Sequence, residues 1–181
     1  MEQQYRVYLR ALEPEDYKTS IAWRQDEEIW SQLCGVKYFV SESYEKKWVE
    51  DAITDHTKIR LAVCMKENNV HIGNVYVTDI DMATRSGVSH ILIGNKEYWG
   101  KGLATEAYKL LLQYVFEERG LHRITAHILE ENKASISLHK KCGYTQEGVF
   151  RKAIFKKGIW HNQLVFSILE EEYFNNKHYN Q

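Results

Sequence analysis

Hydrophobic and polar side chains alternate along several short stretches of the chain, the pattern of strands with one buried face. In the first stretch, from Tyr5 to Leu12, the small or aliphatic residues Val7, Leu9 and Ala11 alternate with larger polar or aromatic ones. Two later stretches meet at a glycine-containing turn, Lys156-Lys157-Gly158, which is typical of a hairpin. The pattern predicts strands at 5–12, 59–65, 70–80, 87–93, 123–129, 144–155 and 160–169.

Hydrophobic residues recur every three to four positions in other segments, which predicts amphipathic helices. The clearest helix runs from Gly102 to Arg119, where Leu103, Ala107 and Leu111 lie one turn apart. Residues 26–40 show no such period and are expected to be irregular. Further helices are predicted at 14–24, at 133–141 and after Ser41 or Ser43, the last with Tyr44, Trp48, Ala52 and Ile53 on one face.

The order of these elements predicts an α/β fold, because strands come first and then alternate with helices around one mixed sheet. A chain of 181 residues with 44% hydrophobic residues is long enough to bury a sizeable core. We find no repeat, linker or low-complexity tract, so we expect a single domain over residues 1–181. The polar residues 170–181 are predicted to form a frayed tail.

Charge and cysteine content narrow the class of protein. The net charge of −1 provides no basic face for nucleic acid, and no hydrophobic run is long enough to cross a membrane. Cys34, Cys64 and Cys142 are far apart and odd in number, so neither a disulfide framework nor a metal site is predicted. We therefore expect a cytoplasmic protein that binds no metal, nucleic acid or membrane.

The segment Glu97–Ala107 carries two glycines, Gly100 and Gly102, between a predicted strand and a predicted helix. Glycine accepts unusual backbone dihedrals and lets a ligand approach closely. The first N–H groups of a helix have no internal partner and lie at the positive end of its dipole. A glycine loop that opens a helix is therefore a natural phosphate site, to which Lys101 adds a positive charge.

Two familiar phosphate-binding motifs do not fit this loop. The string G-x-x-x-x-G-K-[ST] is absent, and the dinucleotide fingerprint G-x-G-x-x-G/A requires a small residue where Thr105 stands. On these residues alone, a phosphate site and a plain turn both stay open.

A second motif about 30 residues later changes that balance. The segments Tyr98–Ala107 and Asn132–Tyr144 together resemble the acetyl-CoA-dependent GNAT N-acetyltransferases, with their Q/R-x-x-G-x-G/A loop and N-x-x-A/S…G-F/Y segment. Segments 9–16, 147–151 and 158–162 resemble the branch of ribosomal-protein N-terminal acetyltransferases and spermidine acetyltransferases. The resemblance covers nearly the whole chain and is specific for the superfamily, much less so for the substrate.

The resemblance implies a GNAT-like α/β sandwich, with a mixed, mostly antiparallel sheet flanked by helices, that transfers an acetyl group from acetyl-CoA directly to a primary amine. The amine would belong to a peptide N-terminus, a polyamine or an amino sugar, and a homodimer is common in this branch. The pantetheine arm would lie between two splayed strands, 87–94 and 123–129. The implied cofactor-binding residues are Leu92, Ile93, Trp99, Gly100, Lys101, Gly102, Leu103, Ala104, Asn132 and Ser135.

Three polar residues are candidates for the chemistry. His139 stands where the family often has a tyrosine that protonates the leaving thiolate, and it can equally be read as a partly exposed helix histidine. Ser135 would lie near the thioester. His90 is a candidate base for the amine or simply a polar residue of the sheet.

Acidic residues near the predicted acceptor side are a further candidate feature. Glu27 and Glu28, beside Asp26, would hold a cationic amine or form an acidic surface turn. Glu97 replaces the usual Gln or Arg at the head of the loop, so its side chain is expected to point away from the phosphates. The departures at Glu97 and His139 motivate one alternative, a non-catalytic acetyl-CoA-binding module, and a Rossmann-type nucleotide binder is another.

Overall fold

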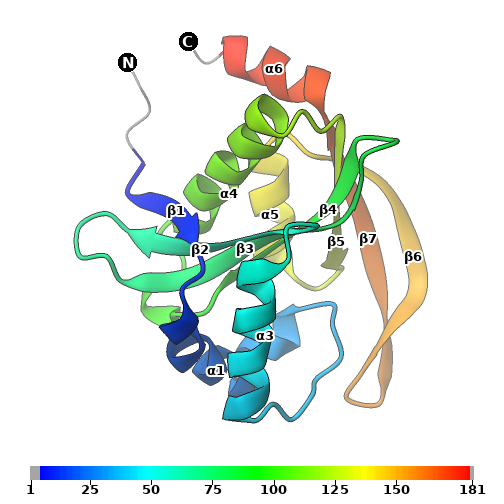
Figure 1. Cartoon of the computed structure of the whole chain (residues 1–181). Coiled ribbons are helices and arrows are strands. Elements are labelled where there is room, and N and C mark those ends of the chain that lie inside the picture. The colour runs from blue at the N-terminus through cyan, green and yellow to red at the C-terminus, as the bar shows by residue number, and fades with distance from the viewer. Residues whose placement is uncertain (1–4, 180–181) are drawn as a thin grey trace.

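The computed structural model describes residues 5–179, with side chains through residue 176, and is built around one sheet of seven strands (Figure 1). The strand order is β1-β2-β3-β4-β5-β7-β6, and every neighbouring pair is antiparallel except β4 and β5. The predicted mixed, mostly antiparallel sheet is confirmed. The strands are β1 Val7–Ala11, β2 Ile59–Met65, β3 His71–Asp81, β4 Ser86–Ile93, β5 Arg123–Leu129, β6 Thr145–Lys156 and β7 Ile159–Leu169.

Helices cover both faces of the sheet (Figure 1). The helix α4 packs with residues such as Val63 and Val75 in the larger core cluster, whereas α3 packs with Ala62 and Cys64 in a smaller one on the opposite face. The helices are α1 Tyr17–Gln25, α2 Glu27–Gln32, α3 Glu42–Thr54, α4 Leu103–Gln113, α5 Lys133–Lys141 and α6 Glu170–Tyr179, with 3-10 turns η1 Pro14–Asp16 and η2 Lys96–Tyr98 and a π turn η3 Tyr114–Glu118.

Two predicted segments differ from the structure. Residues 26–40 are not wholly irregular, because Asp26 caps the short helix α2 by accepting a hydrogen bond from the N–H of Ile29. The expected frayed tail over 170–181 is replaced by α6 up to residue 179, where Tyr173 stacks on Phe116 with ring centroids 5.0 Å apart. Both helices are held by a few specific contacts rather than by a hydrophobic period.

The buried face of α3 also differs from the prediction. Val49 and Ala52 are buried together with Glu45, while Tyr44 is exposed. Glu45 is tolerated inside because its carboxylate accepts a hydrogen bond from Ser20 and lies 3.2 Å from Nε of Arg24. A paired charge thus lies on the buried face of α3, next to the position where the prediction placed Tyr44.

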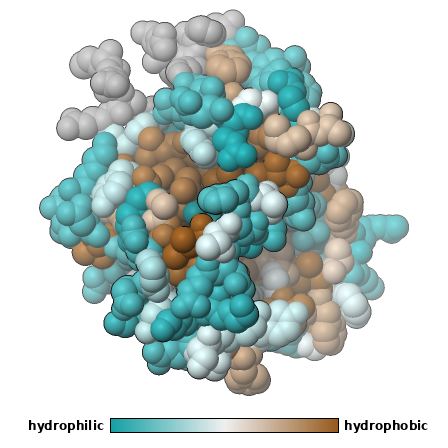
Figure 2. All heavy atoms as spheres, viewed as in Figure 1, coloured by the Kyte–Doolittle hydropathy of each residue, from teal (hydrophilic) through white to brown (hydrophobic). Residues whose placement is uncertain are grey.

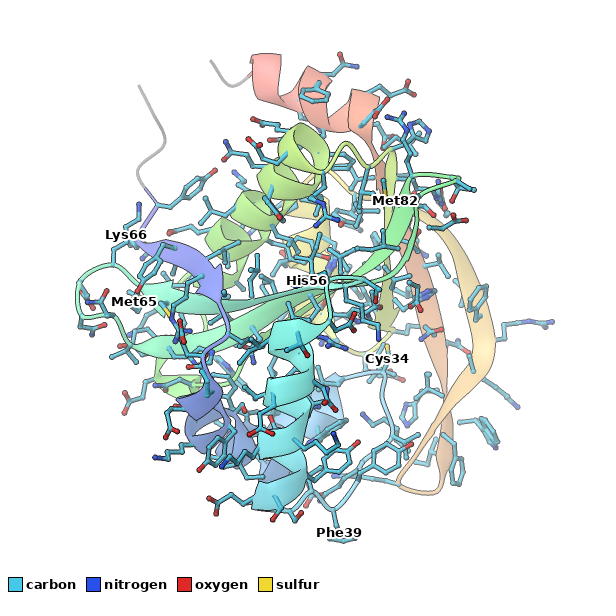
Figure 3. The ribbon with its side chains drawn as sticks, viewed as in Figure 1. Cys34, Phe39, His56, Met65, Lys66 and Met82 are labelled. Atoms are coloured by element: carbon cyan, nitrogen blue, oxygen red, sulfur yellow. The ribbon has the colours of Figure 1, made fainter. Side chains whose placement is uncertain are left out.

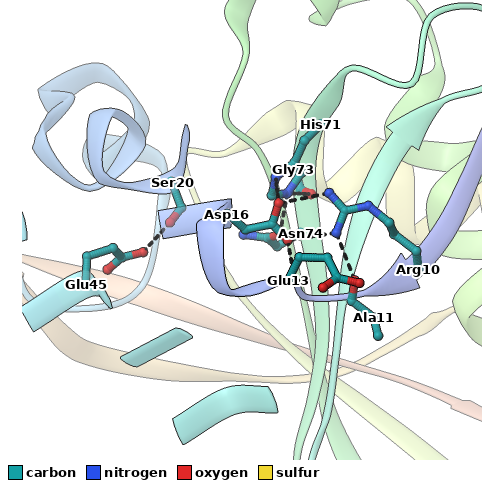
Figure 4. A network of polar contacts seen from close by, with 9 residues as sticks. All are labelled: Arg10, Ala11, Glu13, Asp16, Ser20, Glu45, His71, Gly73 and Asn74. Carbon is teal, nitrogen blue, oxygen red and sulfur yellow. Dashed lines mark hydrogen bonds and ion pairs between the residues drawn. The ribbon is translucent and has the colours of Figure 1, made fainter. Parts of the chain in front are cut away.

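A polar network joins the end of β1 to β3 (Figure 4). Asp16 accepts two hydrogen bonds from the guanidinium of Arg10, at 2.7 and 2.9 Å, and one from the N–H of Glu13. Its other neighbour is His71, whose Nδ1 lies 3.2 Å from Oδ1 of Asp16. Burial alone would raise the pKa of Asp16, but these partners hold it well below its usual value.

The molecular surface is mixed. Polar side chains cover most of the face seen in Figure 2, with hydrophobic ones gathered near its centre. The ring of Phe39, between α2 and α3, is fully exposed and points away from the body of the protein (Figure 3). Among the described residues, no helix has the length and apolar character needed to span a membrane.

Candidate functional site

The sheet opens between its two parallel strands. The register of β4 and β5 runs only from Ser86–Arg123 to Val88–Thr125, and beyond it the strands diverge. A pocket of about 970 Å³ lies at this opening and is lined by the later residues of both strands, among them His90, Leu92 and His127. The expected gap between strands 87–94 and 123–129 is therefore present.

The pocket reaches both helical layers of the molecule. Ser89 faces α4, because its hydroxyl lies 2.5 Å from that of Tyr108. The next residue, His90, faces the opposite layer, since its register partner Tyr76 packs edge-on against Trp48 of α3. One half of the pocket is lined by the glycine loop and α5, the other by residues of α1 and α2, by Tyr76 in the middle of β3 and by the later residues of β5.

The glycine loop presents free N–H groups to the first half of the pocket. Gly100 and Gly102 have φ of +72° and +80°, values that side-chain-bearing residues rarely adopt, and Gly102 is the N-cap of α4. Across the described part of the chain, no hydrogen bond within the protein uses the backbone N–H groups of residues 100–104. A cluster of free donors at a helix N-terminus is suited to an anionic ligand such as a phosphate.

An ion pair that was not predicted from the sequence holds this loop against the residue that precedes β1. Arg6 donates from Nε to Glu106 on the first turn of α4, at 2.8 Å, and from Nη2 to the carbonyl of Lys101, at 2.7 Å. The carbonyl of Lys101 is thereby turned toward β1. No sequence signal links residues 100 positions apart, so this contact was visible only in the structure.

Two residues of the loop lie differently from the prediction. The N–H of Trp99 donates to the carbonyl of Lys96, so it is not free for a ligand; its indole N–H instead ties the loop to the carbonyl of Ile93, at 2.7 Å. The ammonium of Lys101 lies 5.3 Å from the ring centroid of Tyr98, outside the pocket lining. Glu97 is exposed and also lies outside the lining, as expected.

The first turn of α5 links the two halves of the pocket. Oδ1 of Asn132 caps the helix by accepting from the N–H of Ser135, and Nδ2 donates to the carbonyl of Gln32 at the end of α2. Asn132 therefore keeps only one amide hydrogen for a ligand. The predicted cofactor residues Leu92, Ile93, Gly100, Gly102, Leu103, Ala104, Asn132 and Ser135 all line the pocket, as does Trp99.

His139 is buried, with 3% of its surface exposed, which corrects the reading of a partly exposed helix histidine. Its Nδ1 lies 2.8 Å from the carbonyl of Ser135, which can only accept, so Nδ1 carries the proton. Nε2 is then bare and accepts from the hydroxyl of Tyr108, at 2.9 Å. Burial lowers the pKa of His139 to about 4, so the ring is neutral at pH 7.

His90 stands on the other side of the opening with its own partner. The hydroxyl of Thr78 donates its one proton to Asp79, at 2.9 Å, and therefore accepts from Nε2–H of His90, at 3.0 Å. Because the neutral ring has one N–H, Nδ1 of His90 carries no proton. The ring is open to the pocket but surrounded by protein, and desolvation lowers its pKa despite the nearby carboxylate of Asp79.

The acidic candidates Glu27 and Glu28 do not line the pocket, and their assignment as acceptor-binding residues stays a prediction. Glu27 pairs with Lys157 of the β6–β7 hairpin at 2.8 Å, and Glu28 pairs with Lys96 at 2.6 Å. Neither residue lines the pocket, and both carboxylates are exposed. They anchor α2 to neighbouring segments.

The segment after α2 closes the second half of the pocket. The thiol of Cys34 donates to the carbonyl of His127 on β5, at 3.4 Å, and Figure 3 shows this cysteine where the segment meets the sheet. The ammonium of Lys156 reaches back from β6 to the carbonyls of Trp30 and Leu33. All three cysteines are free thiols, as the spacing predicted.

A split sheet with free N–H donors on one side and neutral imidazoles on the other is suited to group transfer from a phosphate-bearing carrier. The sequence profile described as an acetyltransferase (GNAT) domain matches residues 6–145. The chain therefore belongs to the GNAT family, and it is an N-acetyltransferase. The Rossmann-type alternative is wrong.

Several relatives are similar to this chain along nearly its whole length. The spermidine N(1)-acetyltransferase of Vibrio cholerae is 29% identical over 175 residues, which cover 94% of this chain and 96% of the relative. An uncharacterized prophage-derived N-acetyltransferase of Bacillus subtilis is 29% identical over 165 residues, or 91% and 90% of the two chains. A crystal structure of spermidine N-acetyltransferase from Vibrio cholerae with CoA and spermine superposes with a TM-score of 0.87 at 28% identity, covering 94% and 99%.

Proposed function

We propose that this protein transfers an acetyl group from acetyl-CoA directly to a primary amine. The observation that carries the proposal is the single pocket that reaches both layers through the opened sheet. The loop residues fit the cofactor, because their N–H groups are free and because a Cβ added at Gly100 would meet nothing within 4 Å. When bound, acetyl-CoA supplies an acyl group activated as a thioester.

On the cofactor side, the N–H groups of residues 100–104 would hold the diphosphate. The pocket-facing backbone of Leu92 and Ile93 would pair with the pantetheine arm, where β5 has moved away. The hydroxyl of Ser135, 3.4 Å from Nδ1 of His139, is available to donate a hydrogen bond to the departing sulfur. We assign His139 a positioning role, since a neutral ring with both nitrogens engaged is a weak acid.

On the acceptor side, Nδ1 of His90 would take the proton of the attacking amine. An amine attacks only as the neutral base, so a nearby imidazole that is neutral at pH 7 suits this step. Thr78 holds the ring in the tautomer that leaves this nitrogen free. The candidate acceptors are a peptide N-terminus, a polyamine and an amino sugar, and the polyamine is the substrate class named for the relatives.

The test is to mix the protein with acetyl-CoA and a broad panel of amines and to follow the release of CoA thiol, with mass spectrometry of the products. Turnover on at least one primary amine is expected. Binding of acetyl-CoA without turnover on any amine would instead support the non-catalytic module.

A substitution tests the cofactor loop itself. Gly100→Glu should lower acetyl-CoA affinity at least 100-fold in calorimetry, because it places a side chain and a negative charge among the free donors. Gly120→Glu is the matched control: Gly120 also has positive φ and open space at its Cβ, but it ends the helix far from the loop. Equal affinities for the two variants would remove the loop from this role.

A further inference from the structure

The acceptor half of the pocket carries no negative charge. Among the described residues, no aspartate or glutamate lines any part of the pocket, and its charged side chains are those of Arg24 and Lys141. Lys141 lies at the end of α5 in the cofactor half, so Arg24 is the charged group that an acceptor would meet. The remaining polar groups of this half are uncharged, such as the amides of Gln32 and Gln163.

Arg24 adds no net charge to the acceptor half, because it is paired with a buried carboxylate. Its Nε lies 3.2 Å from Oε2 of the buried Glu45, and its guanidinium lies 4.8 Å from the ring centroid of Trp48. The carboxylate of Glu45 is thus already paired and is 1% exposed, so it is not available to a ligand. The pair as a whole contributes no net charge.

The two imidazoles of this half are also uncharged at neutral pH. Desolvation lowers the pKa of both His90 and His127. Four carboxylates around this half have cationic or imidazole partners of their own: Asp26 and Glu28 pair with Lys96, Glu27 with Lys157, and Glu131 with His161. Asp79 lies near both imidazoles but outside the pocket lining, where it accepts a hydrogen bond from the hydroxyl of Thr78. Among the described residues, no carboxylate of the lining therefore contacts an additional ammonium group brought in with the substrate.

Hydrophobic side chains make up the other walls of the acceptor half, chiefly Trp30, Leu33 and Ile154. Such walls favour an uncharged hydrocarbon body, because burial of apolar surface is favourable and burial of an unpaired charge is not. A polyamine would keep one or more ammonium groups after its reacting nitrogen had lost a proton. Those groups would lie beside apolar walls and Arg24 without a counter-ion.

From this charge distribution we infer that the acceptor is a primary amine on an uncharged, largely apolar body, and that polyamines are disfavoured. The inference rests on the proposed acetyl transfer and narrows its acceptor. The acceptor inferred for this chain differs from spermidine, the substrate named for a relative.

The test compares hexylamine with 1,6-diaminohexane, which differ by one terminal amino group, and includes spermidine and glucosamine. We expect kcat/KM for hexylamine to exceed that for the diamine and for spermidine at least tenfold. A diamine, spermidine or glucosamine used as well as hexylamine overturns the inference while leaving acetyl transfer intact. Failure of every amine would instead overturn the proposed function.

Two variants test whether the charge of the pocket wall determines the choice between a monoamine and a diamine. Gln163→Glu and Gln32→Glu each place a carboxylate on the wall of the acceptor half, and each should raise the diamine-to-monoamine ratio of kcat/KM at least fivefold. Gln32 is exposed, so its variant is expected to fold even if the other does not. Gln113→Glu adds the same charge on the exposed side of α4, outside the pocket, and should leave the ratio unchanged. A ratio that neither pocket variant moves contradicts the inference.

Discussion

At the scale of single residues, the hydroxyl of Thr78 decides which nitrogen of His90 is basic. The residue after it, Asp79, has φ of +51°, an uncommon value for a residue with a side chain, and lies where the β3–β4 register shifts. Bulges of this kind often re-aim a side chain beside an active site. Here the distortion puts the carboxylate of Asp79 within 2.9 Å of the Thr78 hydroxyl.

Replacement of Thr78 tests this arrangement. Thr78→Val removes the acceptor of the Nε2–H bond, so the His90 ring is free to take the other tautomer, and kcat should fall roughly 10- to 100-fold. The KM for acetyl-CoA should stay within twofold. Thr78→Ser keeps the hydroxyl and should retain most of the activity in the same steady-state assay. Equal loss in both variants would show that the hydroxyl has no part in the reaction.

His139 should make the stability of the fold depend on pH. The unfolded chain binds a proton at this residue near the ordinary value of 6.5, whereas the folded protein does so only at about 4. The neutral ring therefore makes its full contribution to the free energy of unfolding above pH 6.5. As the pH falls toward 4, this free energy decreases by about 3 kcal/mol. Urea unfolding at pH 7 and pH 4.5 should show a smaller loss for His139→Gln than for the natural protein. Parallel losses would contradict the buried neutral ring.

Sequence reasoning located the residues whose role follows from local chemistry. Gly100 and Gly102 were found because a glycine loop before a helix has a local physical meaning. The partners that orient the site, Arg6 for the loop and Thr78 for His90, come from other strands and left no such signal. The sequence also did not show that lysines from distant segments pair with the acids at 27 and 28.

At the scale of elements, the best predictions were those with a strong period or clear caps. The predicted bounds of β2, β5 and α5 agree with the structure at both ends. α2 was missed because six residues are too few to show a helical period. α6 was missed because its polar sequence does not reveal contacts such as the stacking of Tyr173 on Phe116. The helix predicted at 102–119 ends as a π turn, a feature that hydrophobic spacing does not reveal.

The link between β1 and β3 should make a large contribution to stability. Asp16→Asn weakens both hydrogen bonds from Arg10 and leaves that guanidinium, 29% exposed, without its counter-ion. Loss of one partner from such a pair should cost about 3 kcal/mol of unfolding free energy. Glu15→Gln, in the exposed pair with Lys18, should lower the free energy of unfolding far less in the same denaturation experiment, because solvent screens this pair. A similar loss of unfolding free energy in both variants would mean that the Asp16 network contributes little to stability.

At the scale of the whole molecule, binding and stability should be coupled. Acetyl-CoA at 100 times its Kd would stabilise the folded state by about 2.7 kcal/mol. For a chain of 181 residues this corresponds to a rise in Tm of roughly 5–10 °C. Calorimetric scans with and without the ligand measure the shift, and Gly100→Glu should show almost none. An unchanged Tm in the natural protein would argue against binding to the folded state.

The short parallel ladder between β4 and β5 has a consequence for motion. It divides the sheet into a four-stranded part, β1 to β4, and a three-stranded part made of β5, β7 and β6, which share a ladder over only a few residues. Few hydrogen bonds must break for these parts to separate, so they are natural units of partial opening. Within residues 89–93, the amide hydrogens that face β5 rather than β3 should therefore exchange with heavy water well before those of β2. A ligand that contacts both β4 and β5 should slow that exchange.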